Sequence, residues 1–369
     1  MEYPEYKEAF WYGDDFGIKY SDEEIRTILN DAKCPLNNFV GNEEAVDLIK
    51  ALSFYAWKNN NHAVVNKTTG RDEKMNIALL GSAGLGKTTL AKLFAKTVGL
   101  PFVELHRVKH VQEIFDLINK VLSANKTPIG IYNGELKCPP CIVFVDEVHR
   151  YTGKSRKSPS GIMNDLLKVT EPDDAILTNG RWVLDCKNIC WVVATTEWHL
   201  MPTPFRTRFM EIKLRPYTLE DVTEIVKRRF PDIPLNVCEQ AANYGCLIPR
   251  QALSFAKMFD LDKGYQSLSW EDAAKFVADK KGIDEYGMTS ERRNILILLN
   301  KYGTISRDRL CMLTGLDEIE LFEMVIPPLV KPSVGEALIQ HGRQGWFLSS
   351  AGKAELKKRG IVLIERAAS

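Results

Sequence analysis

The chain has 369 residues, with 49 Lys plus Arg against 48 Asp plus Glu and a formal net charge of +1. A charge this close to zero excludes a generally basic nucleic-acid-coating protein, so any surface that binds nucleic acid must be local. The length predicts two or three domains. No apolar run reaches the roughly 18 to 20 residues of a membrane span, and the acidic, aromatic start does not resemble a signal peptide. We therefore expect no membrane partner and a cytoplasmic location.

Eight cysteines fit a reducing compartment, where thiols stay unpaired. Two spacings, Cys138-x-x-Cys141 and Cys186-x-x-x-Cys190, raise the alternative of a zinc site. However, Cys141 and Cys190 each begin a strongly apolar, strand-like run, where a thiol is more simply a small buried side chain. We therefore expect buried thiols and keep zinc as the alternative.

The N-terminal extension, residues 1–37, is polar and aromatic-rich. It carries one helical pattern, SDEEIRTILNDA, which opens on Ser21 and places Glu24 three positions later. This spacing is a capping box, in which each side chain accepts a hydrogen bond from the other residue's backbone N–H. The pattern predicts a helix that starts after Ser21, but it does not indicate a role for the extension.

Apolar, strand-like runs then recur between helical patterns. They span residues 76–80, 101–105, 141–146 and 190–195. Alternating strands and helices whose strands are continuously apolar predict a parallel sheet covered on both faces. After about residue 213, short amphipathic helices replace the strands. We expect an α/β core over residues 38–212, followed by a helical lid over residues 213–285.

A third unit is predicted over residues 286–369. It combines helical patterns at 290–301, 306–313 and 317–330 with two short strand-like pieces, ALIQHG and GWFLSS, an order that favours a winged helix. The unit holds 12 Lys and Arg against 9 Asp and Glu, and its basic residues gather at a few places. These are Arg292, Arg293, Arg307, Arg309, Arg343 and the stretch KAELKKRG.

The stretch GSAGLGKTT lies between the apolar run MNIALL and the helical pattern TTLAKLFAKTV. Gly81, Gly86, Lys87 and Thr88 fit the phosphate-loop pattern G-x-x-x-x-G-K-[ST] in the strand, turn and helix context that it requires. The glycines let successive backbone N–H groups point at a polyphosphate, and the helix N-terminus adds partial positive charge. Lys87 is predicted to reach the β- and γ-phosphates, and the Thr88 hydroxyl to hold Mg²⁺.

Two more strand-like runs end in polar side chains. The run CIVFVD leads into adjacent carboxylates. We expect Asp146 to hold the metal ion through water and Glu147 to orient and deprotonate the attacking water. The next run ends at Thr195 and Thr196, where a hydroxyl can sense the γ-phosphate or the water.

Basic residues downstream offer further contacts. Arg206 and Arg208 precede a strand-like segment, where a guanidinium can reach a neighbouring subunit's nucleotide as an arginine finger, the alternative being a solvated surface charge. Arg250 starts a helix of the lid, from which it can report the nucleotide state. The basic run HRYTGKSRKS can face a central pore or be a flexible surface loop.

These stretches in this order resemble the AAA+ ATPases, and from about residue 38 to 361 they are similar to the RuvB family of Holliday-junction branch-migration motors. The stretches FVGNEEAVDLIK, GSAGLGKTTLAKLFA, IVFVDEVHR, VVATTEWHLMPTPFRTRFM, LRPYTLEDV and LIPRQAL carry the resemblance, and GIDEYGMTSERRNILILLNKYG and LFEMVIPPLV extend it. The resemblance implies ATP hydrolysis with ATP and Mg²⁺ as cofactors. It also implies a homo-oligomeric ring, a hexamer being one candidate, that acts on double-stranded or branched DNA.

The same resemblance implies roles for individual positions. The phosphates and Mg²⁺ would be bound by Gly84, Gly86, Lys87, Thr88 and Thr89. The residues near the adenine would be Phe39, Val40 and Tyr217. The sensors and the finger acting between subunits would be Thr196, Arg250 and Arg208. The contacts to DNA would come from Arg307, Arg309 and Arg343.

The sequence leaves three functions open. The first is an ATP-driven motor that moves duplex DNA during branch migration in recombination and repair. The second is a clamp-loader or helicase-loader switch in DNA replication, which would use the same nucleotide chemistry to open a protein ring. The third is a DNA-bound scaffold whose assembly ATP controls. A junction-binding or replication protein would be the partner in the first two.

Overall fold

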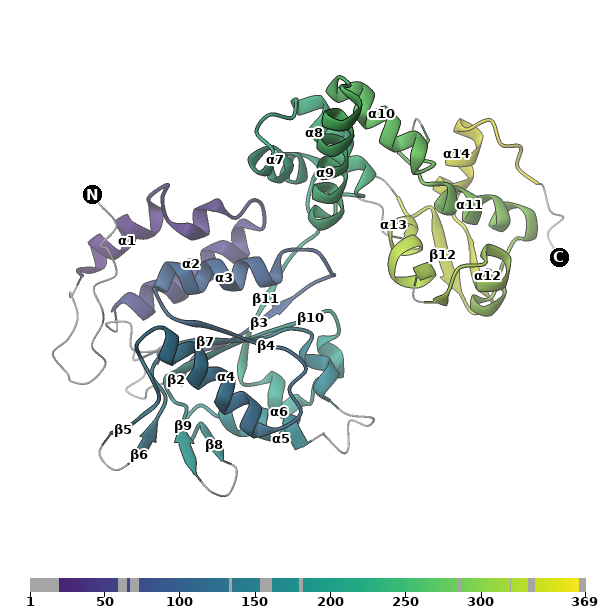
Figure 1. Cartoon of the computed structure of the whole chain (residues 1–369). Helices are drawn as coiled ribbons and strands as arrows, with labels where there is room; N and C mark the ends of the chain where they lie inside the picture. Colours follow the sequence, from purple (N-terminus) through teal and green to yellow (C-terminus); the bar gives the residue numbers. More distant parts are fainter. Residues whose placement is uncertain are drawn as a thin grey trace. The chain divides into compact units, whose positions relative to one another are not determined.

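The computed structural model describes residues 20–58, 65–66, 73–132, 135–152, 161–178, 182–284, 287–318, 320–330 and 336–364. Contacts divide the chain into two units, Met1–Arg215 and Pro216–Ser369. Figure 1 shows the helices and strands of both units. Within the described ranges, no helix is both long enough and apolar enough to cross a membrane.

The first unit is built on a parallel sheet (Figure 1). Among the described residues its strand order is β11–β3–β10–β7–β4, and each neighbouring pair is parallel. Every residue of β3, β7 and β10 is buried, as expected for strands covered on both faces. This sheet confirms the predicted α/β fold class. Its strands are β3 (Asn76–Leu80), β4 (Phe102–Leu105), β7 (Cys141–Val145), β10 (Ile189–Thr195) and β11 (Phe209–Lys213).

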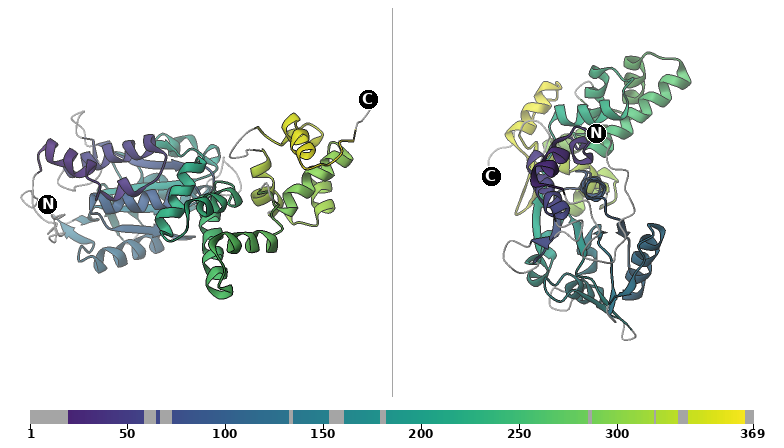
Figure 2. Two further views of the ribbon diagram at one scale, coloured as in Figure 1. Left: turned by 90° about the horizontal axis from the view of Figure 1, so that it is seen from above. Right: turned by 90° about the vertical axis from the view of Figure 1, so that its left-hand side faces the viewer.

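Helices cover both faces of this sheet: α1, α2 and α3 lie on one face, and α4, α5 and α6 lie on the other (Figures 1 and 2). The chain crosses from β3 to the far edge at β4 and then returns through β7 and β10 to β11. Because crossovers between parallel strands are right-handed, the outward and returning helices occupy opposite faces. The helices are α1 (Asp22–Asn30), α2 (Glu43–Lys58), α3 (Lys87–Val98), α4 (Val111–Ala124), α5 (Gly161–Val169) and α6 (Thr203–Arg206), with 3₁₀ turns η1 (Pro35–Asn38), η2 (Val148–Tyr151) and η3 (Trp198–Leu200).

The predicted N-terminal helix is present as α1, and its capping box is complete. The Glu24 backbone N–H donates to Ser21 Oγ at 3.3 Å, and the Ser21 backbone N–H donates to Glu24 Oε2 at 2.8 Å. Hydrogen bonds from the Ser21 backbone and hydroxyl hold the pKa of Glu24 below its usual range. Ile25 and Leu29 are buried, and α1 packs on α2. This part of the N-terminal extension therefore packs as part of the first unit.

Two small sheets of the first unit have no counterpart in the sequence patterns. One has the order β5–β6–β9–β8 and the other pairs β1 with β2. Their strands are two or three residues long, too short to display an alternating pattern. The strands are β1 (Val65–Asn66), β2 (Glu73–Lys74), β5 (Gly130–Tyr132), β6 (Glu135–Lys137), β8 (Ile176–Thr178) and β9 (Val183–Asp185).

The four cysteines with suggestive spacings, Cys138, Cys141, Cys186 and Cys190, are all buried. Cys190 Sγ lies 3.3 Å from the Met75 carbonyl, a weak hydrogen bond inside the core. The buried-thiol interpretation is therefore confirmed. In the described part of the chain, no group of three or more His, Cys, Asp or Glu side chains is arranged to hold a metal ion.

The second unit begins with a packed group of helices rich in small residues. Ala241 and Ala242 of α8 and Ala252 and Ala256 of α9 are fully buried, which lets the two helix backbones approach closely. These helices agree with the short amphipathic helices that the sequence predicts after about residue 213. The helices are α7 (Leu219–Arg229), α8 (Leu235–Tyr244), α9 (Pro249–Gln266) and α10 (Trp270–Lys280).

The rest of the second unit, residues 287–364, combines helices with a two-stranded antiparallel hairpin, β12–β13. Ile305, before α12, forms an isolated antiparallel bridge with Trp346 of β13. We call this part the C-terminal module. Its elements are α11 (Ser290–Tyr302), α12 (Arg307–Thr314), the π-helical turn η4 (Glu320–Val325), α13 (Pro327–Val330), β12 (Ile339–Gly342), β13 (Gly345–Leu348) and α14 (Ser350–Lys358).

One expectation for the C-terminal module was wrong. The helix predicted over 317–330 is divided into η4 and α13. Pro327 and Pro328 explain the break, because proline has no backbone N–H and its ring clashes with the preceding helical turn. Arg292, one of the basic residues that the sequence groups together in this module, is only 8% exposed. Its guanidinium therefore belongs to an internal contact.

Candidate active site

The glycine loop, Asp146, Glu147 and Thr196 gather at the carboxyl edge of the main sheet, whereas Arg208 directly precedes β11 and lies at the opposite, amino edge. Strand β10 lies between β3 and β7, and its register pairs Thr195 with Leu80 and Val193 with Val145. Asp146 and Glu147 therefore leave β7 level with the end of β10, while the glycine loop leaves β3 on the other side. The crevice outside the carboxyl ends of parallel strands is the usual ligand site of such sheets.

The loop after β3 has a backbone that only glycine adopts readily. Gly81, Gly84 and Gly86 have φ values of +147°, +83° and +82°. At Gly81 a Cβ would lie 3.0 Å from both the Leu214 carbonyl oxygen and Leu85 Cδ1. Gly86 is the N-cap of α3 and supplies no capping side chain. The first N–H groups of α3 are thus left to bind an anion at the helix N-terminus.

Lys87, the first residue of α3, is only 6% exposed. Its Nζ donates hydrogen bonds to the Gly81 carbonyl at 2.7 Å and to the Ser82 carbonyl at 2.9 Å. These bonds hold the ammonium group over the glycine loop. Thr88 is half-buried and Thr89 is exposed on the following positions of α3. A cation beside inward-facing N–H groups is an arrangement that binds polyphosphate.

His149 connects the carboxylates that follow β7 to the end of β10. Its Nδ1 lies 3.2 Å from Glu147 Oε2 and 2.8 Å from Thr195 Oγ1, and its Nε2 lies 3.4 Å from Glu197 Oε2. Glu147 has φ +48° and ψ +50°, a left-handed conformation that costs about 1–2 kcal/mol for a residue with a side chain. The backbone sets the direction of the Glu147 side chain, and His149 lies within ion-pair distance of its Oε2, a buried atom with no hydrogen-bond partner among the described residues.

Of the two predicted sensing hydroxyls, only one is open to a ligand. Thr195 is 1% exposed, and its Oγ1 accepts the Glu197 backbone N–H at 2.9 Å in addition to its contact with His149. Thr196, the next residue, is exposed. The structure therefore gives Thr195 an internal bonding role and leaves the Thr196 side chain accessible.

A cavity of about 370 Å³ adjoins the two carboxylates, Asp146 and Glu147. It lies where the segments after β4 and β7 meet, and the Val108 backbone N–H donates to the Tyr151 hydroxyl at 3.1 Å across this junction. The cavity leaves space for water and ions beside the carboxylates. Its lining residues are His106, Arg107, Val108, Asp146, Glu147, Arg150 and Tyr151.

Arg208 is held within its own unit. Its Nη2 forms an ion pair with Glu171, its Nη1 donates to the Pro204 carbonyl, and the side chain is 16% exposed. Arg206 has a buried Nε for which no hydrogen-bond partner is found among the described residues. Glu171 follows α5, and no feature of its local sequence indicates this pairing.

The segment before α2 is tied to the last residues of the first unit. Asn42 accepts the Arg215 backbone N–H at 2.5 Å and donates to the Arg215 carbonyl at 3.2 Å, while the Leu214 N–H donates to the Leu80 carbonyl at 2.8 Å. Leu80 is the last residue of β3 and directly precedes the glycine loop. These bonds therefore place the segment that contains Phe39 and Val40 at the carboxyl edge of the sheet, near the glycine loop. Both side chains are half-buried.

The remaining predicted residues lie in the second unit. Tyr217 is 5% exposed and precedes α7, and Arg250 is exposed near the start of α9. Arg307 and Arg309 occupy the first turn of α12, where Arg307 pairs with Glu318 at 2.7 Å. Arg343 is exposed in the turn between β12 and β13. Most of the basic run after the carboxylates, residues 149–158, lies outside the described residues, which resume at residue 161.

Two residues of the site were missed by the sequence reasoning. His149 stands three positions after Asp146 in DEVH, so its proximity to the carboxylates was a usable signal. Glu171 offered no such signal, because its partner Arg208 is 37 positions away.

Comparisons with known proteins agree with this geometry. The model of the ATPase family associated with various cellular activities (AAA) matches residues 77–217, which span the glycine loop and both carboxylates. The Holliday junction branch migration complex subunit RuvB of Wolbachia sp. subsp. Brugia malayi is 26% identical over 353 residues, covering 90% of this chain and 95% of that protein. RuvB of Wolbachia pipientis wMel is 27% identical over 330 residues, covering 86% of this chain and 91% of that protein.

Solved structures show the same fold. The Thermotoga maritima RuvB Holliday junction branch migration motor has a TM-score of 0.61 and 19% identity, covering 89% of this chain and 98% of that one. A variant of the same protein has a TM-score of 0.62 and 20% identity, with coverage of 87% and 96%. Residues 77–217 are therefore an AAA-type ATPase domain, with which the chain binds and hydrolyses ATP, and the chain is similar to RuvB over most of its length.

Proposed function

We propose that this ATPase is a DNA motor, in which subunits of an oligomeric ring couple ATP hydrolysis to duplex translocation or to branch migration of Holliday junctions. The observation that carries the proposal is the extent of the similarity to RuvB, which spans the ATPase domain and the C-terminal module alike. The curated relatives are named for branch migration. With this proposal we predict a role in DNA recombination or repair and a cytoplasmic location.

We assign the chemical steps to the residues at the sheet edge. The glycine loop and Lys87 bind the triphosphate, and Thr88 with Asp146 holds Mg²⁺, whose preferred ligands are oxygen atoms. Mg²⁺ would neutralise the phosphate charge as the γ-phosphoryl group leaves. Glu147 takes the proton of the attacking water. The open Thr196 hydroxyl contacts the γ-phosphate or that water.

We assign the remaining nucleotide contacts from the family pattern. Phe39, Val40 and Tyr217 surround the adenine, and the half-buried or buried apolar surface of all three suits a planar base. Arg250 reports the nucleotide state to the lid. Arg208 completes the site of a neighbouring subunit, so each site needs two copies of the chain.

Substitution of Lys87 by alanine is expected to weaken binding of a non-hydrolysed ATP analogue about 10- to 100-fold, because a hydrogen bond to a charged group contributes about 1.5–3 kcal/mol. Lys92→Ala is the matched control. It lies on the same helix, is half-exposed and pairs with Glu104 at 3.0 Å. Equal analogue affinities for the two variants, measured by calorimetry, would contradict the role of Lys87.

We assign DNA contacts to cations of the C-terminal module, which we interpret as a winged helix. The bridge at Ile305 and the β12–β13 hairpin fit that interpretation, and Arg343 lies in the exposed turn of the hairpin. Arg307 and Arg309 lie in the first turn of α12. Cations at a wing tip and a helix end are suited to phosphate contacts.

Removing the Arg343 charge is expected to weaken DNA binding for all sequences alike, since phosphate contacts carry no sequence information. In Arg343→Ala, the slope of log K against log salt should fall by about 1, the value for one lost phosphate contact. Fluorescence anisotropy with duplex DNA at several salt concentrations measures this slope. An unchanged slope in Arg343→Ala, equal to that of the α11 control Lys301→Ala, would exclude Arg343 from the interface.

The function itself is tested with a synthetic four-way junction, purified protein, ATP and Mg²⁺. A motor separates the junction into duplexes only when ATP is hydrolysed. An intact junction in the presence of active ATPase would exclude the motor. Turnover that rises only with an added sliding clamp or helicase would instead indicate a loader, and turnover indifferent to DNA would favour the scaffold.

A further inference from the structure

The turn before α9 is unusually constrained. Cys246 and Leu247 both have φ of +52°, a left-handed region that residues with side chains seldom occupy. At Gly245, a Cβ would lie 2.4 Å from the Ala252 backbone nitrogen. Helix α9 begins at Pro249, directly after this turn, and Arg250 is its second residue. The turn 245–248 therefore sets the position of the start of α9 and with it the position of Arg250.

Arg292 of the C-terminal module holds this turn from outside the lid helices. Its Nη1 lies 2.6 Å from Cys246 Sγ, and the residue is 8% exposed. The Arg292 backbone N–H donates to Thr289 Oγ1 at 3.4 Å, which caps α11 and fixes the start of the helix. Burial raises the pKa of the Cys246 thiol, with Arg292 opposing the shift.

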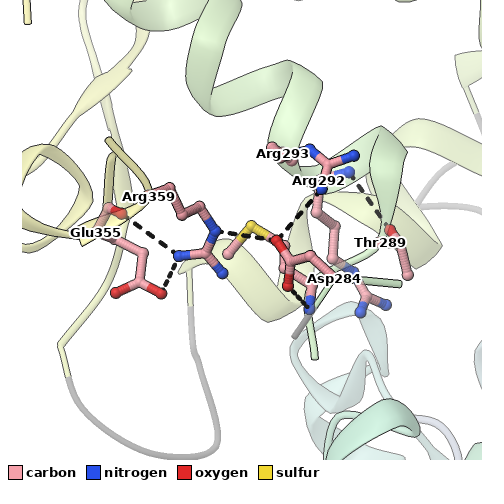
Figure 3. A network of polar contacts seen from close by, with 7 residues as sticks. Asp284, Thr289, Arg292, Arg293, Glu355 and Arg359 are labelled. Carbon is pink, nitrogen blue, oxygen red and sulfur yellow. Dashed lines mark hydrogen bonds and ion pairs between the residues drawn. The ribbon is translucent and has the colours of Figure 1, made fainter. Parts of the chain in front are cut away.

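A second set of bonds fixes the rotation of α11. Asp284, after α10, accepts hydrogen bonds from Arg359 Nε at 3.0 Å and from the Met288 N–H at 2.9 Å, and pairs with Arg293 Nη1 at 3.4 Å (Figure 3). The Arg359 side chain is 5% exposed and also pairs with Glu355. Burial lowers the pKa of Arg359, but the hydrogen bonds to Glu355 and Asp284 outweigh it and raise the pKa above its usual value. This network ties α11 and α14 to the end of the lid.

We propose that Arg292 is a positioning residue for Arg250, through which the C-terminal module sets the nucleotide response of the lid. A buried guanidinium is stable only while its partners stay in place, because leaving it unpaired in the interior is costly. A shift of α11 would therefore move the turn or release Arg292 into water. The inference rests on the proposed role of Arg250 and needs no assumption about which DNA the module binds.

The test is a double-mutant cycle on the affinity for a non-hydrolysed ATP analogue, measured without DNA on the full chain. Arg250→Ala and Arg292→Gln are each expected to weaken analogue binding about tenfold, within the usual range of coupling between sites. Because Arg292 acts through Arg250, the double variant should be no weaker than Arg250→Ala alone. Lys301→Gln, on the exposed side of α11, is the matched control and should bind as wild type.

Cys246→Ala removes the other partner of the contact between Arg292 and Cys246. Hydrogen exchange of the turn amides measures whether loss of this contact loosens the turn. Cys246→Ala should reproduce the affinity loss of Arg292→Gln, and both variants should lose protection at residues 246–248 while the α11 amides stay protected. A variant with a loosened turn and unchanged affinity would overturn the inference, as would additive effects in the cycle. If Arg250→Ala leaves the affinity unchanged, the proposed role of Arg250 fails and the inference falls with it. If Arg250→Ala weakens binding but Arg292→Gln does not, the role of Arg250 stands and the inference about Arg292 is refuted.

Discussion

Substitution of Glu147 by glutamine is expected to lower kcat for ATP hydrolysis by about 10²- to 10⁴-fold, the usual contribution of a general base. Glutamine preserves the shape of the side chain and its proximity to His149, but it cannot take a proton from water. Binding of ATP should change little, because Lys87 and the glycine loop hold the phosphates. Steady-state turnover and calorimetry with an ATP analogue measure the two effects separately.

Glu197→Gln is the control for this substitution. It removes the other carboxylate that contacts His149, at 3.4 Å from Nε2, and leaves Glu147 in place. A small change in kcat for Glu197→Gln beside a large loss for Glu147→Gln would assign the effect to proton transfer. Comparable losses would mean that the histidine contacts, rather than a base at position 147, limit turnover.

The second large effect is expected for Arg208→Ala. An arginine finger contributes about 10³- to 10⁵-fold to kcat, because its charge stabilises the transferring phosphoryl group. In the single chain this guanidinium pairs with Glu171. Completion of a neighbouring site would therefore exchange a carboxylate for a phosphate, two partners that a guanidinium binds with the same bidentate geometry.

Mixing two inactive variants tests whether Arg208 acts between subunits. Arg208→Ala keeps its own phosphate loop and Glu147, while Glu147→Gln keeps Arg208. If the finger acts between subunits, a mixed ring contains some sites with an intact base and an intact neighbouring arginine, and turnover reappears on mixing. Arg229→Ala, an exposed arginine of α7, should be active alone. Mixtures with no more activity than their separate components would place Arg208 in the site of its own subunit.

Local sequence was sufficient for features that depend on neighbouring residues. The glycine loop needs positive φ at three nearby positions, and the glycines at 81, 84 and 86 allow this conformation to be predicted from the sequence. The Ser21 and Glu24 capping box is likewise closed within one helical turn. The buried strands were predictable because a strand covered on both faces must be apolar along its whole length.

Other parts of the fold could not be predicted from local sequence patterns. The small sheet β5–β6–β9–β8 joins strands of three residues from segments far apart in the chain, and so short a segment shows no period. Similarly, the helical pattern over 317–330 favours one helix, whereas the missing N–H groups of Pro327 and Pro328 divide it.

By itself, the amino-acid sequence determined that a triphosphate-binding loop, two carboxylates and an α/β sheet occur in this chain, because each is encoded within a few adjacent residues. Only the tertiary structure decided which polar groups meet. It joined His149 to Thr195, Glu171 to Arg208 and Arg292 to Cys246, over separations of 46, 37 and 46 positions. The reason is physical: charge and hydrogen-bonding capacity are properties of one residue, whereas burial and pairing depend on which distant segments the fold packs together.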